Sequence, residues 1–81
     1  MTDLTEVVLA IFRDELSIEV PGPDVDVIET GLLDSLGLVT LVVSLEQSCG
    51  VEIPFETLDV DDFRTTRSIV QLVEARREES A

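Results

Sequence analysis

The chain has 81 residues, and 18 acidic residues against five arginines give it a net charge of −13. A surface of this sign repels nucleic acids and anionic membranes, which argues against DNA, RNA and membrane binding. The charge favours partners with basic docking patches, or it serves only to keep the protein in solution. Two of the arginines, Arg64 and Arg67, are expected to serve local charge balance.

Length and residue usage also limit the chemistry. A single domain with one modest core is expected over residues 1–81. The sequence contains no histidine, so it has no Ser-His-Asp or Cys-His arrangement, and we predict that it is not an enzyme. Cys49 is the single cysteine, which leaves no internal disulfide and no zinc site. The sequence shows neither a signal peptide nor a transmembrane stretch, so we expect a cytoplasmic protein.

Apolar residues at helical spacing predict a first helix over residues 3–16, with Thr2 as its N-terminal cap. Residues 17–34 are expected to form a long ordered loop, because Pro21-Gly22-Pro23 interrupts any helix. A loop of this length in so small a domain is uncommon without a functional reason. Three residues are expected to point inward and hold it down, namely Val25, Val27 and Ile28.

A second helix is predicted over residues 35–48, capped by Asp34 and ended by Gly50. At about 100° per residue its apolar side chains fall on two separate arcs. The core arc holds Leu38, Leu41, Val42, Leu45 and Cys49. The second arc lies beside Ser35 and Glu46 and holds Leu36, Val39 and Val43. An exposed apolar patch of this kind favours a docking surface, unless the first loop covers it.

The remainder of the chain predicts one short and one long helix. Residues 51–54 are expected to be extended, because the residue before a proline avoids the helical region. A short helical turn at 59–63 precedes a last helix at 66–78, capped by Thr65 or Thr66. The predicted fold is all-α. It is a small antiparallel bundle of three main helices plus one short helix, with a long loop between the first two.

Ser35 is the residue of greatest chemical interest. It falls on the first turn of the second helix, where free backbone N–H groups and the positive end of the helix dipole favour an attached phosphate. A serine at a helix start usually serves only as a cap. Because the chain has no histidine to activate it, Ser35 is a candidate modification site rather than a candidate nucleophile.

Several motifs occur at a fixed spacing between Leu32 and Val73. They are Asp34-Ser35-Leu36, the pattern Leu-x-x-Leu-Val-x-x-Leu-Glu from Leu38 to Glu46, Glu52-Ile53-Pro54, the Thr65-Thr66 helix start and the apolar run from Ile69 to Val73. With this set of motifs the chain resembles the acyl carrier and peptidyl carrier protein family, as a discrete, stand-alone carrier.

The resemblance implies that Ser35 takes 4'-phosphopantetheine from coenzyme A through a phosphopantetheinyl transferase. The thiol of that arm would hold an acyl or aminoacyl group as a thioester. The residues implied in partner recognition are Asp34 and Leu36 for the transferase, and Val39, Val43 and Glu46 for other enzymes. Those enzymes are an adenylating enzyme or acyltransferase that loads the arm, and a downstream synthase or transferase. The carrier is expected to be a monomer without catalytic residues or bound metal.

The second helix departs from the fatty-acid type of carrier. Gly37, Thr40 and Gln47 stand at positions that are often acidic in such carriers. This favours a specialised pathway of the polyketide or nonribosomal peptide type, as in antibiotic biosynthesis, or a carrier that holds an amino acid. Two alternatives remain open: a carrier for fatty-acid synthesis, and an acidic helical interaction module that has no arm.

Overall fold

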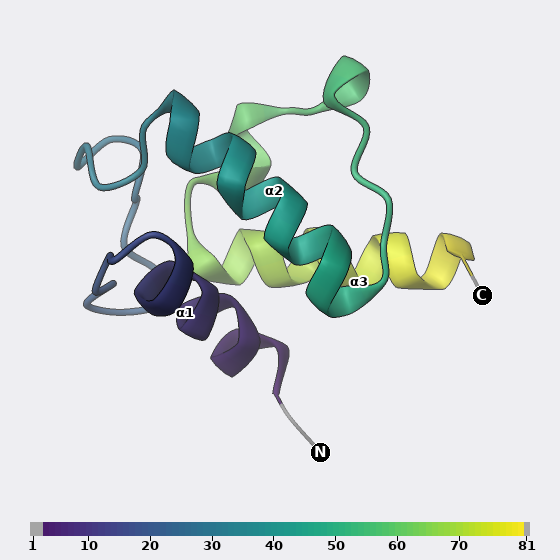
Figure 1. The fold of residues 1–81 in the computed structure, drawn as a ribbon, viewed down its shortest axis with the longest axis horizontal. Coiled ribbons are helices and arrows are strands. Elements are labelled where there is room, and N and C mark those ends of the chain that lie inside the picture. Colours follow the sequence, from purple (N-terminus) through teal and green to yellow (C-terminus); the bar gives the residue numbers. More distant parts are fainter. Residues whose placement is uncertain (1–2, 81) are drawn as a thin grey trace.

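The computed structural model describes residues 3–80, and the side chains of residues 3–78. Three α-helices account for most of this part of the chain (Figure 1). They are α1 (Leu4–Glu15), α2 (Ser35–Cys49) and α3 (Thr66–Ser80), with two short 3₁₀ helices between the last two, η1 (Phe55–Thr57) and η2 (Val60–Phe63). No strand occurs in residues 3–80, so the prediction of a small all-α helical bundle is confirmed.

The core lies where α1 packs against both α2 and α3. Two phenylalanines, Phe12 and Phe63, are its largest wholly buried side chains. The other apolar residues with no exposed surface are Val8, Val27, Leu41, Val42, Leu45, Ile69 and Val73. Aliphatic side chains therefore do most of the packing in a bundle that has only three aromatic residues. Among the described helices, none combines the length and the apolar composition that crossing a bilayer requires.

Side-chain caps determine where the helices begin. Asp3 caps α1, where its carboxylate accepts the Thr5 N–H at 2.9 Å. The predicted cap, Thr2, lies outside the described residues. At α3 the hydroxyl of Thr65 accepts the Ser68 N–H at 3.0 Å, which settles the choice between Thr65 and Thr66. Thr66 is wholly buried instead.

The loop between α1 and α2 is attached to the start of α3. The Val27 N–H donates to the Arg64 carbonyl at 2.7 Å, and the Arg67 N–H donates to the Pro23 carbonyl at 3.0 Å. Three residues of this loop were predicted to point inward. Val27 is wholly buried, whereas Val25 and Ile28 are only half-buried. The loop is therefore an ordered part of the bundle rather than a free tether.

The connection from α2 to α3 runs back along α2 toward its N-terminus, and η1 projects from one corner of the molecule (Figure 1). Val51 and Ile53 are buried, and no helix forms there, as predicted for residues 51–54. The predicted turn at 59–63 is η2, with Asp59 accepting the Asp61 N–H at 2.9 Å. The helical turn η1 was not predicted. It begins after Pro54, whose fixed φ suits the residue before a helix.

Candidate functional site

Ser35 is exposed and is the first residue of α2. Asp34, immediately before it, accepts the Gly37 N–H at 2.7 Å through its side chain and the Leu38 N–H at 2.8 Å through its carbonyl. The first N–H groups of a helix lack partners inside the helix, and the dipole makes this end positive. The fold thus presents the Ser35 hydroxyl to solvent on a rigid, electropositive helix start.

Gly37 keeps this helix start closely packed. A Cβ at this position would lie 3.0 Å from a Leu33 methyl and 3.2 Å from the capping oxygen of Asp34. Both distances are shorter than ordinary van der Waals contacts. Glycine is unfavourable inside a helix, but at position 37 it leaves the room that the Asp34 cap and the buried Leu33 need.

A groove of about 260 Å³ opens beside Ser35. Its walls come from three parts of the chain: the end of the first loop, the first turn of α2, and η2. The residues that line it are Ile28, Leu33, Asp34, Ser35, Leu38 and Val60. Apart from Asp34 and Ser35 the walls are apolar. Val60 was not expected here, because no spacing or motif in the sequence relates it to Ser35.

The second apolar arc of α2 is exposed. Leu36 is 80% accessible, Val39 47% and Val43 40%, whereas Leu41, Val42 and Leu45 on the core arc are wholly buried. The two arcs predicted from the sequence are therefore confirmed, and the alternative that the first loop covers the patch is wrong. Two further exposed apolar residues, Phe55 and Val60, belong to the connection and were missed.

Glu46 has an internal partner that the sequence did not reveal. Its carboxylate Oε2 accepts the backbone N–H of Ile53 at 3.0 Å, which fastens the start of the α2–α3 connection to α2. Glu46 is half-buried and is the sole acidic residue of α2. The exposed face of α2 therefore carries no acidic residue of its own.

Two ion pairs fasten the first loop to the start of α3. Arg67 bonds to both carboxylate oxygens of Asp24 at 2.6 and 3.1 Å, and this hydrogen bonding lowers the pKa of Asp24. The pKa of Asp26 is also lowered, first by the Glu29 N–H and then by Arg64, which lies 3.1 Å away. The predicted role of both arginines in local charge balance is confirmed.

Cys49 is half-buried near the C-terminal end of α2. Loss of solvation raises the pKa of its thiol, although Arg77 acts in the opposite direction. No group of acidic or cysteine side chains in the described residues is arranged to hold a metal ion.

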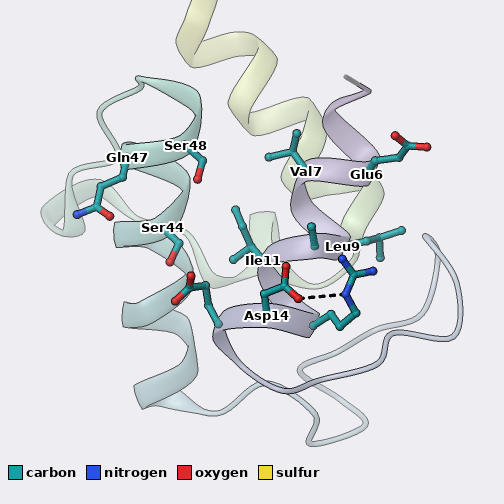
Figure 2. A pocket seen from close by; sticks show the side chains of 11 residues that line it. Glu6, Val7, Leu9, Ile11, Asp14, Ser44, Gln47 and Ser48 are labelled. Atoms are coloured by element: carbon teal, nitrogen blue, oxygen red, sulfur yellow. Dashed lines mark hydrogen bonds and ion pairs between the residues drawn. The ribbon is translucent and has the colours of Figure 1, made fainter. Parts of the chain in front are cut away.

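A larger open groove, of about 710 Å³, lies between α1 and α2 (Figure 2). Ser44, Gln47 and Ser48 line it from α2. Asp14 lines it from α1 and bonds to Arg13 rather than to a group across the groove. This groove therefore shares no residue with the site at Ser35.

Comparison with known proteins defines the class to which this fold and site belong. The family model of the phosphopantetheine attachment site matches residues 6–73, which is most of the chain. The chain therefore belongs to the carrier-protein family that bears this prosthetic group. Such carriers are not enzymes, and they act with a phosphopantetheinyl transferase and with enzymes that load and unload the arm.

Among its relatives are proteins named D-alanyl carrier protein. The one from Enterococcus faecalis is 36% identical over 75 residues, which cover 90% of this chain and 96% of that protein. The one from Bacillus velezensis is 42% identical over 49 residues, or 60% of this chain and 63% of its own length. A Streptococcus pyogenes relative is 43% identical over 51 residues, which cover 63% of this chain and 65% of that protein.

The residues at the start of α2 fit the prosthetic group. Ser35 offers an exposed hydroxyl, and the helix start offers N–H groups suited to the phosphate that follows it. The neighbouring groove has apolar walls and is open to solvent, so a flexible chain of amide and methylene groups can lie along it. None of the contacting side chains would place a buried, unpaired charge against such a chain.

Proposed function

We propose that Ser35 is the attachment residue and that the protein carries an aminoacyl group between enzymes. The observation that carries the proposal is the position of Ser35, exposed on the first turn of α2 beside an apolar groove. The bound arm would supply a terminal thiol, on which the cargo is held as a thioester. The remaining chemistry belongs to the partner enzymes, because the chain has no histidine.

The residues around Ser35 would have supporting roles. Asp34 caps α2 and so holds the serine and the free N–H groups in position for the phosphate. Ile28, Leu38 and Val60 would flank the arm at the groove. Leu36, Val39 and Val43 form the exposed surface that partner enzymes would contact, together with Asp34 and Glu46 as the sequence predicted.

The cargo we propose is a small aminoacyl group such as D-alanine, loaded by an adenylating enzyme. Two observations support it. The relatives above are named D-alanyl carrier proteins, one of them matched over 90% of this chain. The helix α2 also contains a single acidic residue, the half-buried Glu46, and this scarcity of acids is what argued against fatty-acid synthesis in the sequence. The polyketide or nonribosomal peptide pathway predicted from the sequence finds no support in the names of these relatives and stays a prediction.

Modification of Ser35 can be tested by mass spectrometry. The purified protein is incubated with coenzyme A, Mg²⁺ and a broad-specificity phosphopantetheinyl transferase. We expect the mass of one phosphopantetheine to be added, with loss of 3',5'-ADP from coenzyme A. Ser35→Ala should abolish the gain, whereas Ser48→Ala, a matched change at an exposed serine of α2, should retain it. A wild-type protein that gains no mass would overturn the proposal and leave the acidic interaction module.

The cargo needs a separate experiment on the modified protein. Samples receive either D-alanine, ATP and a D-alanine-adenylating enzyme, or malonyl coenzyme A and a malonyl acyltransferase. We expect a hydroxylamine-sensitive D-alanyl thioester and no malonyl thioester. Loading by the malonyl enzyme alone would show that the cargo is a malonyl group and not D-alanine. The proposal that the arm is attached to Ser35 would be unaffected.

A further inference from the structure

The charge around Ser35 is distributed in a way that the recognition of α2 does not explain. A surface that attracts a partner by charge needs acids close to the contact, yet beside Ser35 α2 offers only its capping residue Asp34, whose carboxylate accepts the Gly37 N–H. Glu46, the one acid within the helix, is half-buried and accepts the Ile53 N–H. Most of the acidic residues behind the net charge of −13 therefore lie on other elements.

Acidic residues occur instead on the two elements that wall the groove opposite α2. Ile28 and Val60 line the groove, and Glu29 follows the first while Asp59 precedes the second. Asp62 lies two positions further along η2. All three acids are exposed, and none of them pairs with an arginine in the described part of the chain. We call Glu29, Asp59 and Asp62 the acidic rim.

The nearby basic residues do not compensate this rim. Arg64 is engaged by Asp26 and Asp61, and Arg67 is engaged by Asp24. The rim therefore keeps its charge. Leu36 is 80% and Val60 44% exposed, so exposed apolar residues and exposed acids occur on the same elements around the groove. Together these features describe an interface with an apolar centre and a charged edge.

The geometry assigns this surface to one partner. An enzyme that modifies Ser35 must reach its hydroxyl, and so it must cover the groove and the elements that wall it. An interface of ordinary size, about 800 Å² on each protein, is large enough to include η2 as well as the start of α2. The same enzyme must also bind coenzyme A, whose phosphates require basic groups at the mouth of its active site.

We propose that the acidic rim on the first loop and η2, and not α2, supplies the electrostatic attraction for the phosphopantetheinyl transferase, while Leu36 and Val60 supply its apolar contact. The proposal rests on the proposed attachment at Ser35. It predicts a transferase surface with an apolar contact over the start of α2 and basic side chains over η2.

The test compares two triple variants of equal charge. The rim variant is Glu29→Gln, Asp59→Asn and Asp62→Asn, and its Asp59→Asn change keeps a side-chain oxygen that can cap η2. The control variant is Glu15→Gln, Glu74→Gln and Glu78→Gln, at exposed residues of α1 and the far half of α3. Each raises the net charge by three. Steady-state phosphopantetheinylation is measured with coenzyme A and a broad-specificity transferase, at low and high salt.

We expect the rim variant to raise KM for the carrier by about fivefold at low salt with kcat little changed, and to flatten the salt dependence of kcat/KM. The control variant should stay within about twofold of the wild type. Val60→Ser should raise KM at both salt concentrations, because its contact is apolar.

Several outcomes would overturn the inference. Equal KM values for the two triple variants would show that location of the charge is irrelevant. A carrier dimer that dissociates only in the rim variant, seen by analytical ultracentrifugation, would assign the surface to self-association. If the wild-type protein is not modified at all, the proposed function fails as well, whereas a modified wild type with an unaffected rim variant rejects this inference alone.

Discussion

The two long segments that join the helices are held to the bundle by different means. The first loop has two backbone hydrogen bonds and two ion pairs to residues at the start of α3, and all four come from residues 23–27, so its middle is fastened to the bundle. The α2–α3 connection is held at its two ends, by the Glu46 bond and buried Val51 and Ile53 on one side and by buried Phe63 on the other. Between them, residues 55–62 are mostly exposed.

The two segments therefore have different roles: the first loop supports the site at Ser35, and the connection exposes apolar side chains to partner enzymes. The first loop forms the fixed wall that places Ile28 and Leu33 beside Ser35. The connection passes the same groove but leaves Phe55 and Val60 uncovered. A substitution in the first loop or at either end of the connection should therefore affect stability, and one in residues 55–62 should affect partner enzymes instead.

The two phenylalanines of the connection provide the largest contrast. Phe63 is wholly buried, so Phe63→Ala should lower the free energy of unfolding by about 3–5 kcal/mol. Phe55 is 52% exposed, and Phe55→Ala should change it by less than about 1 kcal/mol. Urea unfolding followed by circular dichroism measures both. Similar losses for the two variants would mean that the middle of the connection is as tightly held as its ends.

Glu46 tests whether one residue can contribute both to stability and to the contact with partner enzymes. Glu46→Ala removes the acceptor of the Ile53 N–H and should cost about 1–2 kcal/mol in unfolding free energy. Glu46→Gln keeps an oxygen in place and should restore most of that loss. Charge reversal at this residue should therefore reduce stability as well as any partner contact. Rates of arm loading in the Gln variant then report the predicted partner contact alone, and wild-type rates would remove Glu46 from the recognition surface.

Thr66 marks the point where the first loop meets α3. Its hydroxyl oxygen is buried and, within the described residues, has no hydrogen-bond partner. Thr66→Val keeps the shape, and we expect it to raise the unfolding free energy by about 1 kcal/mol. Thr65→Val is the matched control and should lower it, because the Thr65 hydroxyl caps α3. Destabilisation by both changes would indicate that Thr66 has a partner, such as water.

The ion pairs of the first loop should make the smallest contribution, because solvent reaches both of them: the Asp24–Arg67 pair is largely exposed and the Asp26–Arg64 pair is partly exposed. The pKa values of Asp24 and Asp26 are lowered in the folded protein, mainly by Arg67 and by the Glu29 N–H respectively. Their stabilisation is present above the unfolded pKa of about 3.9 and is lost as the pH falls through the lower folded pKa. As the pH is lowered below about 4, the unfolding free energy of the double variant Asp24→Asn, Asp26→Asn should therefore decrease less steeply than that of the wild type. An equally steep fall in that double variant would contradict this assignment.

Local signals predicted much of this molecule. The cap at Asp34, the choice of Thr65 or Thr66 as the cap of the last helix, the stop at Gly50 and the two arcs of α2 all follow from spacing within one turn or one helix. Interactions between distant residues could not be predicted in this way. The Glu46–Ile53 bond, the pairing of Asp24 with Arg67 and the place of Val60 in the groove depend on how the chain folds back on itself. Neither periodicity nor residue type encodes that path.

The environment of Cys49 has a consequence for a protein that works through a thiol on an attached arm. A raised pKa keeps Cys49 protonated at neutral pH, and partial burial limits its access to reagents and to other sulfur atoms. The modified carrier that has not yet been loaded therefore has one reactive thiol, at the end of the arm, and one protonated, half-buried thiol, at Cys49. A thiol-directed label applied briefly at neutral pH should mark the arm alone, and an acyl group should stay where the loading enzyme placed it instead of migrating to the polypeptide.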